Sequence, residues 1–504
     1  MMTEMKYFKR TWLGWALLLL IVSCSGDHAS VTLSRDSRFT GRGNVGEPLI
    51  KLTLLPDGPC KLHSVTVTLE AEASDVSMLS LKEGDRMLGC AQVRPGKSSY
   101  ILRCGKEYSD STVLVLCADI REKATEGGKV SAEITEVRLR GCRLVPEAPP
   151  AGPREILLCR KRLFAPGDYG SNFWRIPAIR QLSDGTLLVV NDRRNLTEND
   201  LPSEIDVVSR YSRDLGQTWS EPVTLAKNQG HMFGYGDPGL MELEDGTVIC
   251  TFAGGSNFFN STLESPQRSY VCFSHDHGRT WDAPRDITST VWGPDPDNPS
   301  CKVYHSNFFS SGNGLVLKQG KYKGRALVAG VLAREGNLLC NHAVYTDDGG
   351  QTWHVSDLAY GEPGRPGDEA KMVELADGRI LMSVRQQGDR GFAISKDGGQ
   401  TWKQRGNWPD IHANACNGDL IRYNDTILMH TLPNSMRREN VSVFLSFDEG
   451  RTWPEHKVIS NKDAMYSSLT VLKDGTLGAY IEENINGVEL WYERFSFEWL
   501  RRHE

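Results

Sequence analysis

One eight-residue pattern, Ser/Thr-x-Asp-x-Gly-x-Thr-Trp, occurs five times between residues 212 and 453. The copies end at Trp219, Trp281, Trp353, Trp402 and Trp453, so that successive copies lie 62, 72, 49 and 51 residues apart. Spacings of this size fit repeating units of about 40–50 residues that carry loop insertions. The pattern therefore predicts a domain built from repeats of one small β-sheet.

Each copy contains the residues of a tight β-hairpin turn. The Asp carboxylate can accept backbone N–H bonds, the Gly can take a positive φ, and the Trp can cover the hairpin. A second set of Asp-Gly hairpin signals, such as Asp184-Gly185 and Asp474-Gly475, alternates with the first. Together they predict a β-propeller. We expect the repeat carboxylates, including Asp214 and Asp276, to build turns and not to act as catalytic acids.

Composition excludes two classes of function. The chain has 58 Lys and Arg against 64 Asp and Glu, a net charge of −6, which argues against a nucleic-acid partner. None of its 12 Cys falls in a Cys-x-x-Cys pattern, so a zinc site is not indicated. We expect no metal and no cofactor.

Residues 1–23 have the features of an export signal of the lipoprotein type. Basic residues precede an apolar run from Trp12 to Val22, which is too short to span a bilayer. The residues before Cys24 resemble a bacterial lipobox, in which this Cys is lipidated; an ordinary secretory signal is the alternative. Both interpretations predict export. We expect a cell-envelope lipoprotein of the outer membrane or periplasm that touches the membrane only through a lipid anchor, or a secreted protein if the lipobox is not used.

The Pro-rich segment 146–153 is expected to be a linker between two domains. Before it, residues 27–145 contain several segments in which apolar and polar residues alternate, which predicts a small β-sandwich. This sandwich is expected either to bind carbohydrate or to brace the propeller. Residues 154–504 are assigned to the propeller.

The element Trp174-Arg175-Ile176-Pro177 precedes the five repeats, and the combination resembles the sialidase (neuraminidase) family with Asp boxes over about residues 156–500. The sandwich and the lipobox-like signal resemble the exported exo-sialidases of Bacteroidetes. The resemblance implies an all-β fold, with a six-bladed β-propeller catalytic domain after a small β-sandwich domain. It also implies sialylated glycans (glycoproteins, glycolipids and oligosaccharides) as partners. We expect a monomer.

Sialic acid carries a carboxylate on its anomeric carbon, and the planar guanidinium of Arg pairs bidentately with such a group. The family uses three Arg for this purpose. Arg175 matches the first, Arg385 the second and Arg438 the third, where Arg438 fits better than its neighbour Arg437. Arg194 resembles an additional Arg of the same pocket and fits better than Arg193.

A carboxylate nucleophile would be repelled by the carboxylate of this substrate, whereas a Tyr hydroxyl would not. Sialidases are a known exception among glycosidases because they use Tyr. Tyr466, in Asp-Ala-Met-Tyr-Ser-Ser-Leu, matches the nucleophile position of the family. Glu369 matches its partner; Glu374 is the alternative but lies in a strand-like segment.

Asp200 follows a strand-like run and matches the family's acid/base residue, with Asp192, Glu198 and Asp206 as alternatives. Late in the chain, Glu482 matches the Glu that braces the first Arg. Its neighbour Glu483 is the alternative.

These assignments imply an exo-α-sialidase that releases terminal sialic acid from glycoconjugates by a retaining mechanism. A trans-sialidase would use the same site, and a non-catalytic sialoglycan-binding propeller would need only its Arg residues. The joint presence of Tyr466, Glu369 and Asp200 favours an enzyme, a glycoside hydrolase.

Overall fold

The computed structural model describes residues 29–502 except 35–37, 147–152, 231, 263–264, 293–303, 363, 461–462 and 486. The export signal and Cys24 lie outside the described residues. The chain divides into two compact units, Met1–Ile156 and Leu157–Glu504. No helix in the described part of the chain is long and apolar enough to cross a membrane.

The first unit is a β-sandwich of two antiparallel sheets around one apolar core. One sheet has the order β1 (Ala29–Ser34), β3 (Glu47–Pro56), β8 (Thr112–Ile120), β5 (Val76–Glu83), β6 (Arg86–Gln92). The other has the order β2 (Phe39–Gly41), β11 (Arg154–Leu157), β9 (Lys129–Leu139), β4 (Cys60–Glu70), β7 (Ser99–Tyr108), and β10 (Cys142–Leu144) pairs with β9. Because β11 follows the Pro-rich segment and pairs with β9, the sandwich includes residues beyond 153.

The second unit is a β-propeller, with six sheets of mainly antiparallel strands in the described residues. The first three blades are β13 (Phe173–Gln181), β14 (Leu187–Arg194), β15 (Ile205–Ser212), β16 (Val223–Ala226); β17 (Tyr235–Glu242), β18 (Val248–Gly255), β19 (Gln267–Ser274), β20 (Arg285–Asp286); and β21 (Tyr304–Phe309), β24 (Ala326–Arg334), β25 (Leu338–Thr346), β26 (His354–Val355). Two short strands extend these sheets: β22 (Gly312–Asn313) pairs with β17, and β23 (Leu315–Val316) pairs with β24.

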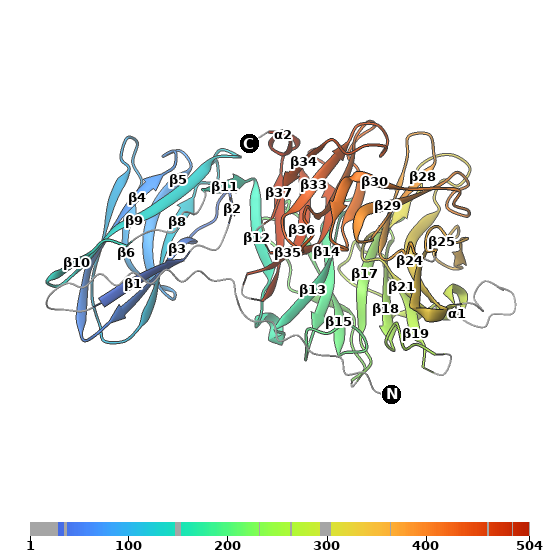
Figure 1. Ribbon diagram of the computed structural model, residues 1–504, viewed down its shortest axis with the longest axis horizontal. Coiled ribbons are helices and arrows are strands. Elements are labelled where there is room, and N and C mark those ends of the chain that lie inside the picture. Colours follow the sequence, from blue (N-terminus) through green and yellow to red (C-terminus); the bar gives the residue numbers. More distant parts are fainter. Residues whose placement is uncertain are drawn as a thin grey trace. The chain divides into compact units, whose positions relative to one another are not determined.

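The other three blades are β27 (Ala370–Glu374), β28 (Ile380–Val384), β29 (Gly388–Ser395), β30 (Gln404–Ala413); β31 (Asp419–Arg422), β32 (Leu428–Pro433), β33 (Val441–Ser446), β34 (Glu455–Val458); and β35 (Ala464–Val471), β36 (Leu477–Asn484), β37 (Val488–Phe495) with β12 (Cys159–Phe164). Figure 1 shows β12 beside β37, so that strands from opposite ends of the unit close the ring. The helical elements are short: η1 (Asp168–Gly170), α1 (Thr288–Val291), η3 (Glu335–Asn337) and α2 (Phe497–Arg501).

The five repeats form hairpin turns at the outer strands of the first five blades. In the second copy, Asp276 Oδ1 accepts the backbone N–H of Thr280 at 2.9 Å, and Asp276 Oδ2 accepts the Thr280 hydroxyl at 2.6 Å. The repeat Gly also packs against the preceding blade: a Cβ at Gly350, which has a φ of +88°, would lie 2.8 Å from the Phe273 ring. The repeats therefore hold each turn closed and seat it on its neighbour, as expected for turn-building residues.

We expect Asp276→Ala to lower the free energy of unfolding by about 1–2 kcal/mol, because it removes the acceptor of several turn hydrogen bonds. Any catalytic activity of the propeller should be unchanged, since the turn lies at the edge of a blade. Chemical denaturation and steady-state kinetics measure the two effects. Asp282→Ala, at an exposed position near the same turn, is the control; a loss of kcat specific to Asp276→Ala would contradict a purely structural role.

In the last blade, Arg160 lies between two buried carboxylates. Its Nη2 is 2.5 Å from Glu483 Oε2 and its Nε is 2.8 Å from Glu493 Oε1, and all three side chains are almost fully buried. Among the described residues, the Arg160 guanidinium thus pairs with both carboxylates. Burial raises the pKa of Glu493 to about 8; Arg160 opposes the shift and Glu483 adds to it.

This raised pKa predicts how stability depends on pH. Between the ordinary pKa of Glu and about pH 8, folded Glu493 keeps a proton that the unfolded chain has lost, so stability falls as the pH rises. Urea unfolding at pH 5, 6.5 and 8 should show this loss, and Glu493→Gln should reduce it by about 1 kcal/mol or more. Parallel pH profiles for the parent and the variant would contradict the assignment.

Candidate active site

Three of the candidate residues lie at or just before the beginnings of innermost strands, at one end of the propeller axis. Arg175 is in β13 and Tyr466 is in β35, in each case the third residue of the strand, while Glu369 directly precedes β27. Hydrogen bonds and ring contacts join these side chains, which come from three blades. Residues up to 291 positions apart in the sequence are brought together in this way.

Two of the innermost strands contain the same irregularity. The pairing of β13 with β14 shifts between Arg175 and Ala178, where Ile176 has a φ of 62°. The pairing of β17 with β18 shifts between Gly236 and Gly239, where Asp237 has a φ of 60°. Pro follows each of the two positive-φ residues. Bulges of this kind redirect side chains, so this local geometry helps to present Arg175 and Asp237 at the site.

Tyr466, Glu369 and Arg385 form one hydrogen-bonded group. The Tyr466 hydroxyl donates to Glu369 Oε2 at 2.7 Å and accepts from Arg385 Nη1 at 2.7 Å. Arg385 Nη1 also pairs with Glu369 Oε2, and its Nε lies 3.2 Å from Asp368 Oδ2. Burial raises the pKa of Tyr466 well above its ordinary value; Arg385 opposes this shift and Glu369 adds to it. The hydroxyl is therefore protonated at neutral pH, with a carboxylate in place to receive its proton.

Three guanidinium groups surround the Tyr466 ring. The Cζ atoms of Arg175, Arg438 and Arg385 lie 5.3, 5.6 and 5.9 Å from the ring centroid. Arg438 is half-buried, whereas its neighbour Arg437 is exposed. This concentration of positive charge is suited to an anionic ligand.

Glu482 holds Arg175 in place. Its Oε1 accepts from Arg175 Nε at 2.7 Å and from the backbone N–H of Ile176 at 2.6 Å, and its Oε2 accepts the backbone N–H of Tyr466 at 3.2 Å. The neighbouring Glu483 pairs with Arg160 instead. Of the two candidates, only Glu482 contacts the first Arg.

Arg194 is buried and positions the loop that carries Asp200. Its Nη2 lies 2.6 Å from Asp200 Oδ1 and 3.3 Å from Asp192 Oδ2. The Asp200 side chain is 83% exposed, so it is open to a ligand and able to move. Arg193 pairs with Asp206 at 2.5 Å and faces the opposite side of the same strand. Arg193 and Asp206 thus form a pair of their own.

Two carboxyls lie behind Asp200: that of Asp192, which is buried, and that of Asp237, which is half-buried. Asp192 Oδ1 accepts the backbone N–H of Asp237 at 3.1 Å. Burial raises the pKa of Asp192 to about 7 against the effect of Arg194, and burial together with Asp192 and Glu369 raises that of Asp237. The sequence interpretation did not include Asp237. Its signal was the Asp237-Pro238 pair, which has the same bulge geometry as Ile176-Pro177.

Glu374 does not belong to this group, because it ends β27 five residues beyond Glu369. Among the described residues, no cluster of three or more His, Cys, Asp and Glu side chains could hold a metal ion.

The family model described as a BNR repeat-like domain matches residues 200–479, which is more than half of the chain. Curated sialidases are among its relatives: the Micromonospora viridifaciens enzyme is 31% identical over 376 residues, and the Bacteroides fragilis enzyme is 26% identical over 351 residues. The chain belongs to the sialidase family of BNR-repeat proteins. These alignments cover 70% and 63% of this chain but only 55% and 61% of the two relatives.

Solved structures of the sialidase family share the fold. Hadza microbial sialidase Hz136 superposes with a TM-score of 0.72 at 19% identity, covering 93% of this chain and 99% of that chain. The intramolecular trans-sialidase from Ruminococcus gnavus superposes with a TM-score of 0.59 at 18% identity, covering 68% of this chain and 98% of that chain. At identities of 18–19%, these similarities establish that the fold is shared.

Proposed function

We propose that this protein is an exo-α-sialidase that removes terminal sialic acid from sialylated glycans by a retaining mechanism. The observation that carries the proposal is the position of the Tyr466 hydroxyl. It is hydrogen-bonded to both Glu369 and Arg385, inside a ring of three guanidinium groups. A site that only bound an anion would need the charges and not this Tyr–Glu pair.

The first step is the capture of the substrate carboxylate. Arg175, Arg385 and Arg438 supply fixed positive charge from three different blades, and Arg remains charged at any working pH. Glu482 fixes the direction of Arg175, so the clamp is organised before the substrate arrives. The anomeric carbon, which carries the carboxylate, is then held near the Tyr466 oxygen.

The second step forms a bond between the Tyr466 oxygen and the anomeric carbon and breaks the glycosidic bond. Because burial keeps Tyr466 protonated, its proton must leave as the new bond forms, and Glu369 Oε2 is 2.7 Å away to receive it. Asp200 gives a proton to the departing glycosidic oxygen. Arg385 stabilises the negative charge that develops on the Tyr oxygen.

The third step hydrolyses the glycosyl–Tyr466 bond. Water attacks the anomeric carbon while Asp200, now a carboxylate, takes its proton, and Glu369 returns its proton to the Tyr oxygen. Two displacements at one carbon leave the configuration unchanged.

A trans-sialidase is the second candidate, because the fold is shared with the intramolecular trans-sialidase from Ruminococcus gnavus. The two reactions differ only in which group attacks the intermediate. Incubation of the purified protein with a fluorogenic α-sialoside tests the proposal as a whole. Release of the fluorophore is expected, and a failure to release it would overturn both proposed activities, the sialidase and the trans-sialidase.

Asp200→Ala should slow hydrolysis most for the substrates that have the poorest leaving groups. For an activated aryl sialoside we expect about a tenfold loss in kcat/KM, and for a sialylated oligosaccharide a loss of about 100-fold, because only the latter needs protonation. Glu198→Ala, in the same loop and also exposed, is the matched control. An equal loss on both substrates would argue against Asp200 as the general acid.

We also propose that the protein is exported and anchored by a lipid on Cys24. Globomycin-type inhibition of lipoprotein processing in an expressing bacterium should shift its mass, and Cys24→Ala should release it from the membrane fraction.

A further inference from the structure

A cavity lies at the opposite end of the propeller axis from Tyr466. It has a volume of about 520 Å³, and its lining includes residues from the ends of four innermost strands: Arg180, next to last in β13, and the last residues of β27, β31 and β35, which are Glu374, Arg422 and Val471. A second hollow of about 590 Å³ shares Arg180 with it. Five residues of extended strand separate Arg175 from Arg180, which is about 17 Å. Cavities of this size are typical of small-molecule sites.

Arg180 brings a positive charge into this cavity. Its Nη1 donates to Asn313 Oδ1 at 3.2 Å and to the Gly314 carbonyl at 3.4 Å, and both acceptors are neutral. Within the described part of the chain, no carboxylate lies within 4.0 Å of its guanidinium, in contrast to the other Arg of the cavity, Arg422, which pairs with Glu449 at 2.7 Å. Burial lowers the pKa of Arg180, but an Arg side chain stays charged.

The two carboxylates that influence Arg180 most are both occupied elsewhere. Glu242 accepts the backbone N–H and the hydroxyl of Ser183 at 2.7–2.9 Å. Asp419 Oδ2 accepts from Asn313 at 2.7 Å and from Ser468 at 2.7 Å. Neither can turn to Arg180 without giving up these bonds. The guanidinium is therefore held by neutral groups and remains available to an anion.

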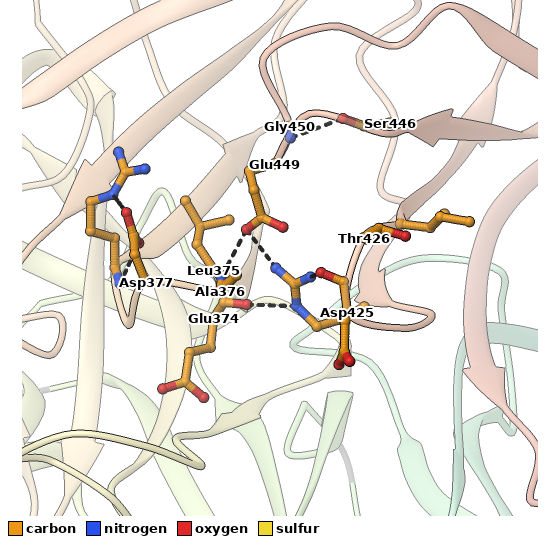
Figure 2. A network of polar contacts seen from close by, with 12 residues as sticks. Glu374, Leu375, Ala376, Asp377, Asp425, Thr426, Ser446, Glu449 and Gly450 are labelled. Carbon is orange, nitrogen blue, oxygen red and sulfur yellow. Dashed lines mark hydrogen bonds and ion pairs between the residues drawn. The ribbon is translucent and has the colours of Figure 1, made fainter.

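Glu374, which lines the same cavity, has a carboxylate oxygen that lacks a hydrogen-bond donor within the part of the chain that the structure describes. It is 8% exposed, and its Oε2 accepts the backbone N–H of Lys318 at 2.8 Å. Its Oε1 has no hydrogen-bond donor among the described residues. Figure 2 shows the Glu374 side chain pointing away from the polar network on its other side, in which Glu449 accepts from Arg422 and from the backbone N–H of Ala376. A buried carboxylate oxygen without a donor is costly, so Glu374 is suited to a ligand that brings one.

We propose that this cavity is a second binding site, separate from the catalytic one, for a small hydroxylated carboxylate such as a sugar acid. The carboxylate of the ligand pairs with Arg180, and a hydroxyl donates to Glu374. Arg422 cannot replace Arg180 as the anion partner, because Glu449 and the carbonyls of Glu374, Asn424 and Asp425 already accept from it.

D-glucuronate is the probe, titrated into the full-length protein by calorimetry or ligand-observed NMR. We expect binding that weakens about tenfold or more in Arg180→Met, because a charged hydrogen-bonded pair is lost. Lys318→Met removes an exposed cation from the same lining and should change the affinity less than threefold. D-glucose, which has the hydroxyls without the charge, and acetate, which has the charge without the hydroxyls, should bind more weakly than D-glucuronate.

Arg438→Gln separates this site from the catalytic one. If D-glucuronate binding is lost in Arg438→Gln and kept in Arg180→Met, the ligand occupies the catalytic site and the proposal is overturned. Because Arg180→Met could disturb Asn313 and Asp419, its thermal unfolding is measured alongside. A crystal of the parent protein soaked in D-glucuronate needs no variant: density for the sugar acid beside Arg180 supports the proposal, and water alone in the cavity refutes it.

Discussion

Replacing Tyr466 by Phe is expected to lower kcat for sialoside hydrolysis by on the order of 10³-fold, because the proposed nucleophile is lost. The substitution removes the oxygen that we propose attacks the anomeric carbon, and it leaves the ring that lies among Arg175, Arg385 and Arg438. KM should change little, because the carboxylate clamp remains. Steady-state kinetics on a fluorogenic α-sialoside measure both parameters.

Tyr480→Phe is a matched control for this variant. Tyr480 is also fully buried in the last blade, and its hydroxyl donates to Asn191 at 2.9 Å. Loss of that bond should lower the free energy of unfolding by about 1 kcal/mol and leave kcat within about twofold of the parent. If Tyr466→Phe retained the activity of Tyr480→Phe, Tyr466 would not be the nucleophile.

Arg438→Gln is expected to lower kcat/KM by several hundred-fold, equivalent to about 3–4 kcal/mol, because one charge of the clamp is lost. Arg438 contacts the Tyr466 ring, but no hydrogen bond or ion pair of its side chain was found among the described residues. Its removal should therefore affect the substrate much more than the fold. Unfolding midpoints of the parent and the variant should differ by little.

Arg437→Gln is the control for the clamp. The two residues are adjacent, yet Arg437 is exposed and Arg438 is half-buried against Tyr466. We expect kcat/KM of Arg437→Gln within about twofold of the parent. The reverse order of effects would assign the third clamp position to Arg437.

The propeller could be predicted because its repeats are local. Each repeat carries its turn, its hairpin and its covering Trp within eight residues, so periodicity alone reveals the architecture. The closure of the ring could not be predicted in this way, since β12 pairs with β37 more than 300 residues away. For the same reason, the pairing of β11 with β9 across the Pro-rich segment left no local signal.

The choice between neighbouring candidates depended on which face of a strand each residue occupies. Glu482 and Glu483 are both fully buried and acidic, so hydropathy could not separate them. Alternation along β36 directs Glu482 to Arg175 and Glu483 to Arg160. Asp237 was missed because an Asp-Pro pair usually marks a turn, whereas here it forms a bulge inside a strand.

The stereochemistry of the first product tests the central claim most directly. Time-resolved ¹H NMR of a sialylated oligosaccharide incubated with the protein should show α-configured free sialic acid first, followed by slow conversion to the β-anomer. Two displacements through a glycosyl–Tyr466 intermediate require that order. Initial release of the β-anomer, or an anhydro sugar as the product, would contradict the proposed retaining hydrolysis.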